Sequence, residues 1–174
     1  MIRTVALIGI SAAVALGSAA SSHQSGLSDP QIAHIAYTAG QIDIEAARQA
    51  LKKTRNPRVR DFATTMVRDH EAVNRQALAL IEKLGVKPEA NSTSANLSKV
   101  AAAKLHSLAR LKGPAYDRAY VTNEVAYHHI VNGALSSALI PGAHNAELKA
   151  LLETGLTLFQ QHEAHAEHLA KQIR

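Results

Sequence analysis

The stretch that decides the fold is Val67–Asn74 (VRDHEAVN), which returns in altered form at Val125–Asn132 (VAYHHIVN). Both follow the pattern V-x-x-H-x-x-V-N, so His70 and His128 occupy the same place in two segments that are 58 positions apart. Successive spacings of three put the valines and the histidine on one face of a helix. We therefore predict two helical hairpins that share this pattern, each with a histidine inside its apolar stripe.

The first residues have the pattern of an export signal. A positive start at Met1–Arg3 precedes an apolar run of 13 residues, Thr4–Leu16, and then a group of small residues. This order is typical of a secretory signal peptide, and the run is too short for a helix that crosses a bilayer. We predict a signal peptide over residues 1–20, cleaved near Ala20, then a flexible tether over 21–28 and one domain over 29–174. The expected location is periplasmic or secreted, and an uncleaved anchor is the alternative.

Composition excludes several classes of function. The chain has no cysteine, so disulfides, thiolate metal sites and thiol catalysis are excluded. Removing Arg3 with the signal peptide reduces the 19 basic residues to 18, against 14 acidic ones, which leaves a net charge of about +4. Aromatic residues make up 3%, too few for base stacking, so nucleic acid is not an expected partner. At most we expect peripheral association with the cell envelope; any protein partner is unknown, and a homo-oligomer stays open.

Apolar periodicity predicts an all-α protein with four long helices and one short helix. The long helices are expected at about 30–54, 57–84, 115–139 and from Asn145 onward, with a polar loop over 86–95 and a short helix over 97–111. A very short connection at Asn56-Pro57 makes the first two helices antiparallel. The short helix lies in a long crossover, so the third long helix can run parallel to the second. This is the connectivity of a ferritin-like four-helix bundle.

Each long helix carries a polar residue on or beside its apolar stripe. A buried carboxylate or imidazole is costly unless it is paired or bound to a cation. If the four helices bring these residues together, they form a ligand set for Fe, Mn, Zn or Cu. The ordinary alternative is that the histidines are hydrogen-bonded core residues. The predicted ligands are Glu45, His70, His128 and His162, with Glu124, His165 and Asp69 as additional candidates. Asp69 is expected to act as an acid that orients an imidazole.

The spacing of these residues differs from that of carboxylate-bridged di-iron bundles, which carry Glu-x-x-His on two helices. Here Glu124 and His128 are four apart, and no glutamate lies three residues before His162. A mononuclear, histidine-rich site is therefore the better prediction. Haem is not expected, because the chain has no Cys-x-x-Cys-His.

Several segments resemble the domain of unknown function 4142 family, which consists of exported bacterial proteins with a predicted ferritin-like fold. They are Gly40–Glu45 (GQIDIE), Asn56–Ala63 (NPRVRDFA), Met66–His70 (MVRDH), Tyr116–Tyr120 (YDRAY) and His162. By position, the resemblance matches the family's recurring acid to Glu45 and its histidines to His70, His128 and His162. The third helix departs from the family, since Glu124 and Tyr127 stand where it more often has Met and Asp.

Two functions compete, because the resemblance implies no established activity. One is a metal-binding bundle of the cell envelope that protects against peroxide or oxygen stress where the metal is redox-active. The other is a non-catalytic envelope stress or interaction protein whose bundle binds a protein or surface partner without metal. The chain has no phosphate-binding loop and no Gly-x-Ser-x-Gly, so hydrolase and nucleotide-binding functions are disfavoured. The sequence does not decide whether the protein is an enzyme, and we expect that it is not.

Overall fold

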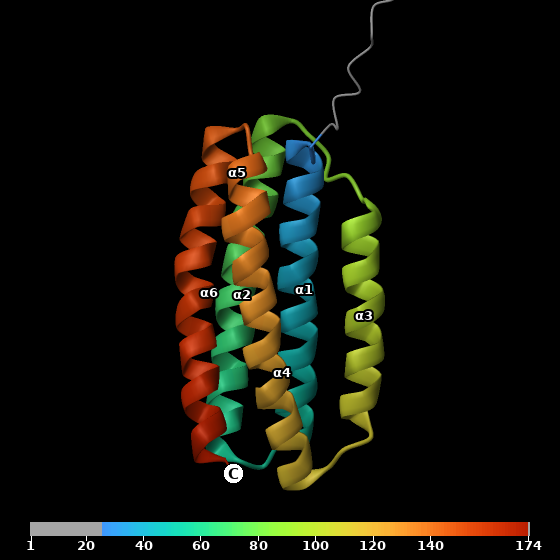
Figure 1. Ribbon diagram of the computed structural model, residues 1–174, viewed down its shortest axis with the longest axis vertical. Coiled ribbons are helices and arrows are strands. Elements are labelled where there is room, and N and C mark those ends of the chain that lie inside the picture. Colours follow the sequence, from blue (N-terminus) through green and yellow to red (C-terminus); the bar gives the residue numbers. More distant parts are fainter. Residues whose placement is uncertain (1–25, 174) are drawn as a thin grey trace, which may run out of the picture.

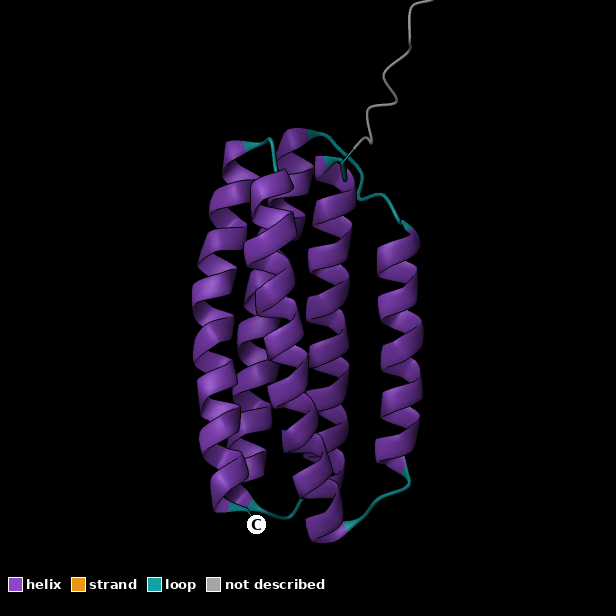
Figure 2. Cartoon of the chain, in the orientation of Figure 1, coloured by secondary structure: helices purple, strands orange, loops and turns teal. Residues whose placement is uncertain are grey.

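The computed structural model describes residues 26–173, which consist of helices and short loops (Figure 2). The predicted signal peptide and residues 21–25 of the predicted tether lie outside the described residues. Within the described part of the chain, no helix is long and apolar enough to cross a membrane. The elements are α1 (Asp29–Lys53), α2 (Pro57–Leu84), α3 (Ser92–Ala109), α4 (Gly113–Ala134), a π-helical segment η1 (Leu135–Leu139), α5 (Ile140–Gly142) and α6 (Ala146–Gln172).

The four long helices α1, α2, α4 and α6 form a ferritin-like bundle, as predicted (Figure 1). α1 and α2 are antiparallel, and α4 and α6 form a second antiparallel hairpin (Figure 1). Between the hairpins, α3 returns the chain along the outside of α1, so that α4 runs in the same direction as α2 (Figure 1). The two copies of V-x-x-H-x-x-V-N thus lie on parallel helices, and both histidines are buried.

Local sequence fixes the ends of the helices. α1 begins with a capping box between Ser28 and Gln31 and has Pro30 in its first turn. Asn56 caps α2, and Gly85 ends it in the left-handed conformation, at φ 64°. Asp29, the first residue of α1, accepts hydrogen bonds from the backbone N–H groups of His144 and Asn145, both at 2.8 Å. This contact joins the start of α1 to the start of α6.

Two predicted boundaries were wrong. The loop after α2 is shorter than 86–95, because Asn91 and Ser94 form a second capping box that starts α3 at Ser92. The third long helix was expected to end at Leu139 before Pro141. It continues through η1 into α5 and ends at Gly142, since proline is tolerated in the first turn of a helical segment.

The core consists of two apolar clusters, one toward each end of the bundle, with a polar layer between them. One cluster centres on Phe62, Tyr116 and Tyr120, and the other on Leu135, Leu152 and Phe159. On each long helix, the buried polar residue lies in sequence between the residues of the two clusters. The buried residues of this polar layer are Asp43 on α1, His70 on α2, Glu124 and His128 on α4, and His162 on α6.

Candidate metal centre

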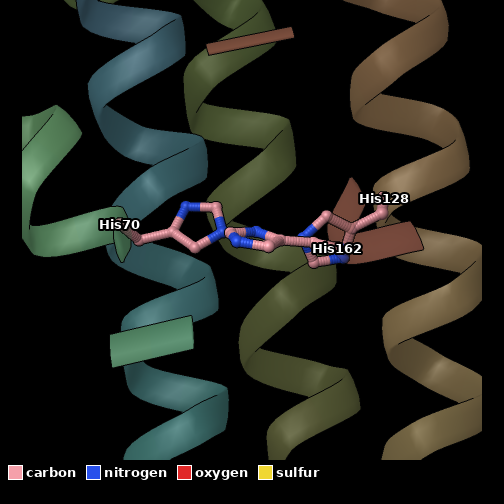
Figure 3. A group of neighbouring side chains, drawn as sticks. All are labelled: His70, His128 and His162. Atoms are coloured by element: carbon pink, nitrogen blue, oxygen red, sulfur yellow. The ribbon is translucent and has the colours of Figure 1, made fainter. Parts of the chain in front are cut away.

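Three histidines from three helices meet in the polar layer. His70, His128 and His162 are all buried, and each offers a ring nitrogen within 4.8 Å of one offered by the other two. Figure 3 shows the three imidazoles directed toward one another from their separate helices. The centroids of the rings are 5.3–5.7 Å apart for each pair. The structure therefore brings together three of the four residues that we predicted as ligands.

The carboxylate that reaches this group is Asp43, which the sequence analysis did not select. Its Oδ2 lies 3.6 Å from His70 Nε2 and 3.5 Å from His128 Nε2. Asp43 belongs to the inward face of α1 together with Gly40, Ala47 and Ala50, all of which are buried. The spacing of three and four in this set was the sequence signal that could have identified Asp43.

The expected acid, Glu45, is exposed to solvent and belongs to neither group of candidate ligands. Its place in the shared pocket was therefore a wrong prediction. Successive residues of a helix are about 100° apart, so two positions from Asp43 the side chain of α1 has turned away from the bundle axis. His165 is also exposed and outside both groups, and its ring instead meets Phe62 edge to face, with centroids 5.1 Å apart.

The backbone of α4 fixes the tautomer of His128. The Nδ1–H of His128 donates to the carbonyl oxygen of Glu124 at 3.0 Å, because a carbonyl can only accept. In the neutral ring, Nε2 then carries the lone pair, and this is the atom that faces Asp43. A metal-binding histidine usually donates a hydrogen bond from one ring nitrogen, which leaves the lone pair of the other nitrogen available to the metal.

His162 is oriented in a comparable way by Asp69, one of the additional candidates. The Nε2–H of His162 donates to Asp69 Oδ2 at 3.1 Å, which leaves Nδ1 with the lone pair. Arg68 in turn donates to both oxygens of Asp69, at 2.7 Å and 3.1 Å, and lowers the pKa of its carboxyl. Asp69 therefore stays ionised and holds the imidazole from outside the layer, the orienting role that we expected for it.

Burial keeps the histidines neutral, which is the form that binds metals. It lowers the pKa of His70 to about 4, and burial together with the neighbouring His70 lowers the pKa of His162 to about 4. Burial also lowers the pKa of His128, although the nearby carboxylate of Asp43 opposes this shift. His70 and His162 are thus available as ligands well below the ordinary imidazole pKa of 6.5, and the pKa of His128 is shifted in the same direction.

Glu124, another additional candidate, extends the layer on the side of Asp43. It is buried and forms with Asp43 and His128 a second group that could hold an ion. Its Oε2 lies 3.9 Å from His128 Nδ1. Burial, and then the charge of Asp43, raise the pKa of Glu124 well above its usual value, and burial also raises the pKa of Asp43. The two carboxyl groups therefore tend to hold protons when no cation is near them.

The comparisons with known proteins agree with the fold and name no activity. Residues 14–169 match the model of DUF4142, a domain of unknown function. No curated protein matches the sequence. The fold is similar to the crystal structure of a DUF305 protein from Streptomyces coelicolor that is described as secreted. That likeness has a TM-score of 0.69 at 11% identity and covers 84% of this chain and 94% of the other.

Proposed function

This chain belongs to the DUF4142 family, a domain of unknown function, and we propose that it binds one divalent transition metal ion through three histidines and one aspartate. The histidines are His70, His128 and His162, which form one group of candidate ligands, and the aspartate is Asp43, which belongs to a second group with Glu124 and His128. One observation carries the proposal. Seven of the eleven buried side-chain atoms that lack a hydrogen-bond partner among the described residues belong to the polar layer. A buried polar atom without a partner costs about 1–3 kcal/mol. A single cation would satisfy at least four of these seven atoms at once.

The distances fit a small coordination sphere. Ligand atoms at about 2.1 Å from an ion in tetrahedral geometry are about 3.4 Å from one another. The 3.5 Å and 3.6 Å separations between Asp43 Oδ2 and the two histidine nitrogens are close to this value. His162 Nδ1 is buried and without a hydrogen-bond partner among the described residues. His162 shares a group of candidate ligands with His70 and His128 but not with Asp43, so it would supply the fourth donor after a small inward shift. The four ligands come from all four long helices, so the ion would stabilise the whole bundle.

The donor set favours Zn²⁺ as the first ion to test, with Fe, Mn and Cu as the other candidates. Three imidazoles and one carboxylate suit all four metals, and the near-tetrahedral spacing is typical of zinc. With a redox-active ion, the same site would support the role in peroxide or oxygen stress that we expect from the sequence. With zinc, the ion would serve to hold the helices together.

We also propose that the domain acts outside the cytoplasm, after removal of residues 1–20. The support is the charged, apolar and small-residue order of the N-terminus, which is typical of export. Mass spectrometry of the exported protein should give a chain that begins near Ser21. Soluble exported protein that still begins at Met1 would contradict this proposal.

Metal binding is tested by elemental analysis of protein from its native compartment, followed by titration of the metal-free protein. Co²⁺ serves as the probe because its visible absorption reports tetrahedral coordination. We expect one equivalent of Co²⁺ to bind, Zn²⁺ to displace it, and either ion to raise the melting temperature. The variants H70A and H128A should each lose most of this rise.

The matched control is His144→Ala, because His144 is exposed at the start of α6 and far in sequence from the polar layer. It should keep the full rise in melting temperature. If the unaltered protein takes up none of the candidate metals, the proposal is wrong. The bundle would then fit the alternative of an interaction protein that needs no metal.

A further inference from the structure

A second feature of the interior is an apolar cavity of about 180 Å³ beside the polar layer. Its wall is made by α1, α2, α4, η1 and α6, with Leu97 of α3 at its edge. Most of the lining is carbon from alanine, leucine and other apolar side chains. The lining extends from the buried Phe159 to Ile130, which is 63% exposed, so the cavity approaches the surface. A dry cavity of about 150 Å³ is large enough to bind benzene.

The π-helical segment η1 contributes to this wall. Leu135 and Leu139, its first and last residues, are both buried and both line the cavity. A π-helical turn inserts one extra residue into a helix, and such turns are frequent at functional sites. The wider turn changes the register of the helix, so the side chains after it meet the bundle differently from those before it.

One polar group in the wall lacks a partner. Asn74, the last residue of the first V-x-x-H-x-x-V-N copy, is 96% buried and lines the cavity. Its Nδ2 has no hydrogen-bond acceptor among the described residues and almost no accessible surface, so the amide must rotate to donate to a ligand. Gly40 of α1 lies against the same amide, and a Cβ built there would be 2.4 Å from Asn74 Oδ1. The glycine thus allows the amide to stand between α1 and α2. An amide donor without a partner in an apolar wall favours a ligand with one acceptor oxygen.

We propose that this cavity binds a small, uncharged, carbon-rich molecule with one carbonyl-type oxygen, which accepts a hydrogen bond from Asn74 Nδ2. The apolar lining selects for the carbon body, and the lack of a charged residue in the wall selects against ions. Phe159 separates the cavity from the polar layer, since its ring stacks on His70 with centroids 4.5 Å apart and an interplanar angle of 9°. A bound molecule would therefore lie one aromatic ring from His70. Binding itself needs no metal, so it goes beyond the function proposed above.

The test is a titration of the full, metal-free protein with cyclohexanone, followed by NMR of the Asn74 side-chain amide. We expect saturable shifts of this amide and of the backbone of η1. Cyclohexane has nearly the same shape but no acceptor, so its affinity should not depend on the Asn74 amide. The variant N74A should bind cyclohexanone about 3- to 10-fold more weakly, the range for one net hydrogen bond, and cyclohexane with unchanged affinity.

Two substitutions on α2 test the location of the ligand. Ala77 is buried in the wall and Ala79 is exposed on the same helix. Ala77→Leu should reduce cyclohexanone affinity at least tenfold by filling the cavity, whereas Ala79→Leu should leave it unchanged. No saturable shift of the Asn74 amide in the unaltered protein would overturn the proposal, whether or not the Ala77 variant folds. Because the protein is metal-free, this outcome is independent of the outcome of the metal titration.

Discussion

The sharpest test of the metal centre is the substitution Asp43→Asn. The amide has nearly the shape of the carboxyl group but is a much weaker metal ligand. Burial raises the pKa of Asp43, so the folded state disfavours its charged form. A neutral group of the same size removes this penalty. The metal-free variant should therefore be as stable as the unaltered protein, to within about 1 kcal/mol, or slightly more stable.

The metal-dependent part of the stability should respond very differently. A metal present at 100 times its dissociation constant stabilises the folded state by about 2.7 kcal/mol. For a domain of this size, that corresponds to a rise in melting temperature of about 5–10 °C. If Asp43 supplies one of four ligands, we expect its loss to weaken binding by about 100-fold, at least as much as the loss of an orienting partner. At the same metal concentration only about 0.4 kcal/mol of stabilisation would remain.

The assay is thermal unfolding with and without Zn²⁺, and its matched control is Glu45→Gln. Glu45 lies two residues from Asp43 on the same helix, is also a carboxylic acid and is exposed. The control should keep the full rise in melting temperature. If Asp43→Asn also keeps it, or if Glu45→Gln loses as much, Asp43 is not a ligand and the four-donor site is refuted.

Two further predictions concern stability. Between pH 6.5 and 4.5 the unfolded chain binds protons at His70 and His162, whose pKa in the folded state is about 4, so acid lowers the stability of the fold. Glu124 opposes this loss, because its raised pKa makes the folded state bind a proton there that the unfolded chain does not. Glu124→Gln removes that opposing effect. In urea unfolding of the metal-free protein, the free energy of unfolding should then fall more steeply as the pH is lowered, by up to about 1.4 kcal/mol per pH unit. An unchanged slope would contradict the raised pKa of Glu124. Gly40→Ala should cost about 1–3 kcal/mol in urea unfolding, because its Cβ would meet the buried amide of Asn74. The cost should largely vanish in an Asn74→Ala background, and equal costs in both backgrounds would refute this contact.

The histidines of the site were predictable because each is a large polar residue inside a strong apolar stripe. On α2, α4 and α6 the stripes contain leucine, valine, phenylalanine and tyrosine, so the inward face is well marked. The repeated V-x-x-H-x-x-V-N then identified two of the three positions independently. Their equal depth was not predictable from distances along the chain, because it depends on how far the two hairpins slide past each other.

The acid was misplaced because α1 gives a weaker signal. α1 packs not only on α2 and α4 but also on α3, so its buried face is broad and includes small residues such as Gly40, Ala47 and Ala50. Small residues mark a face less clearly than large apolar ones. Glu45 follows Ile42 by three residues, which places the two on one face of a helix, whereas the close packing of small residues turns Asp43 inward. Tertiary context therefore decided between two acids that lie only two positions apart.

The position of the polar layer bears on the purpose of the bundle. A bundle stabilised by packing alone would be served better by apolar residues at these points, because buried ionisable groups cost more than they return unless every donor and acceptor is satisfied. In this protein the cost falls on all four long helices at one level, between two apolar clusters that already join the helices. The groups around the layer are arranged to support ligands: Asp69 orients His162, and the backbone of α4 orients His128. Both contacts direct a lone pair into the layer, and this orientation favours an interior ion over three unrelated core histidines.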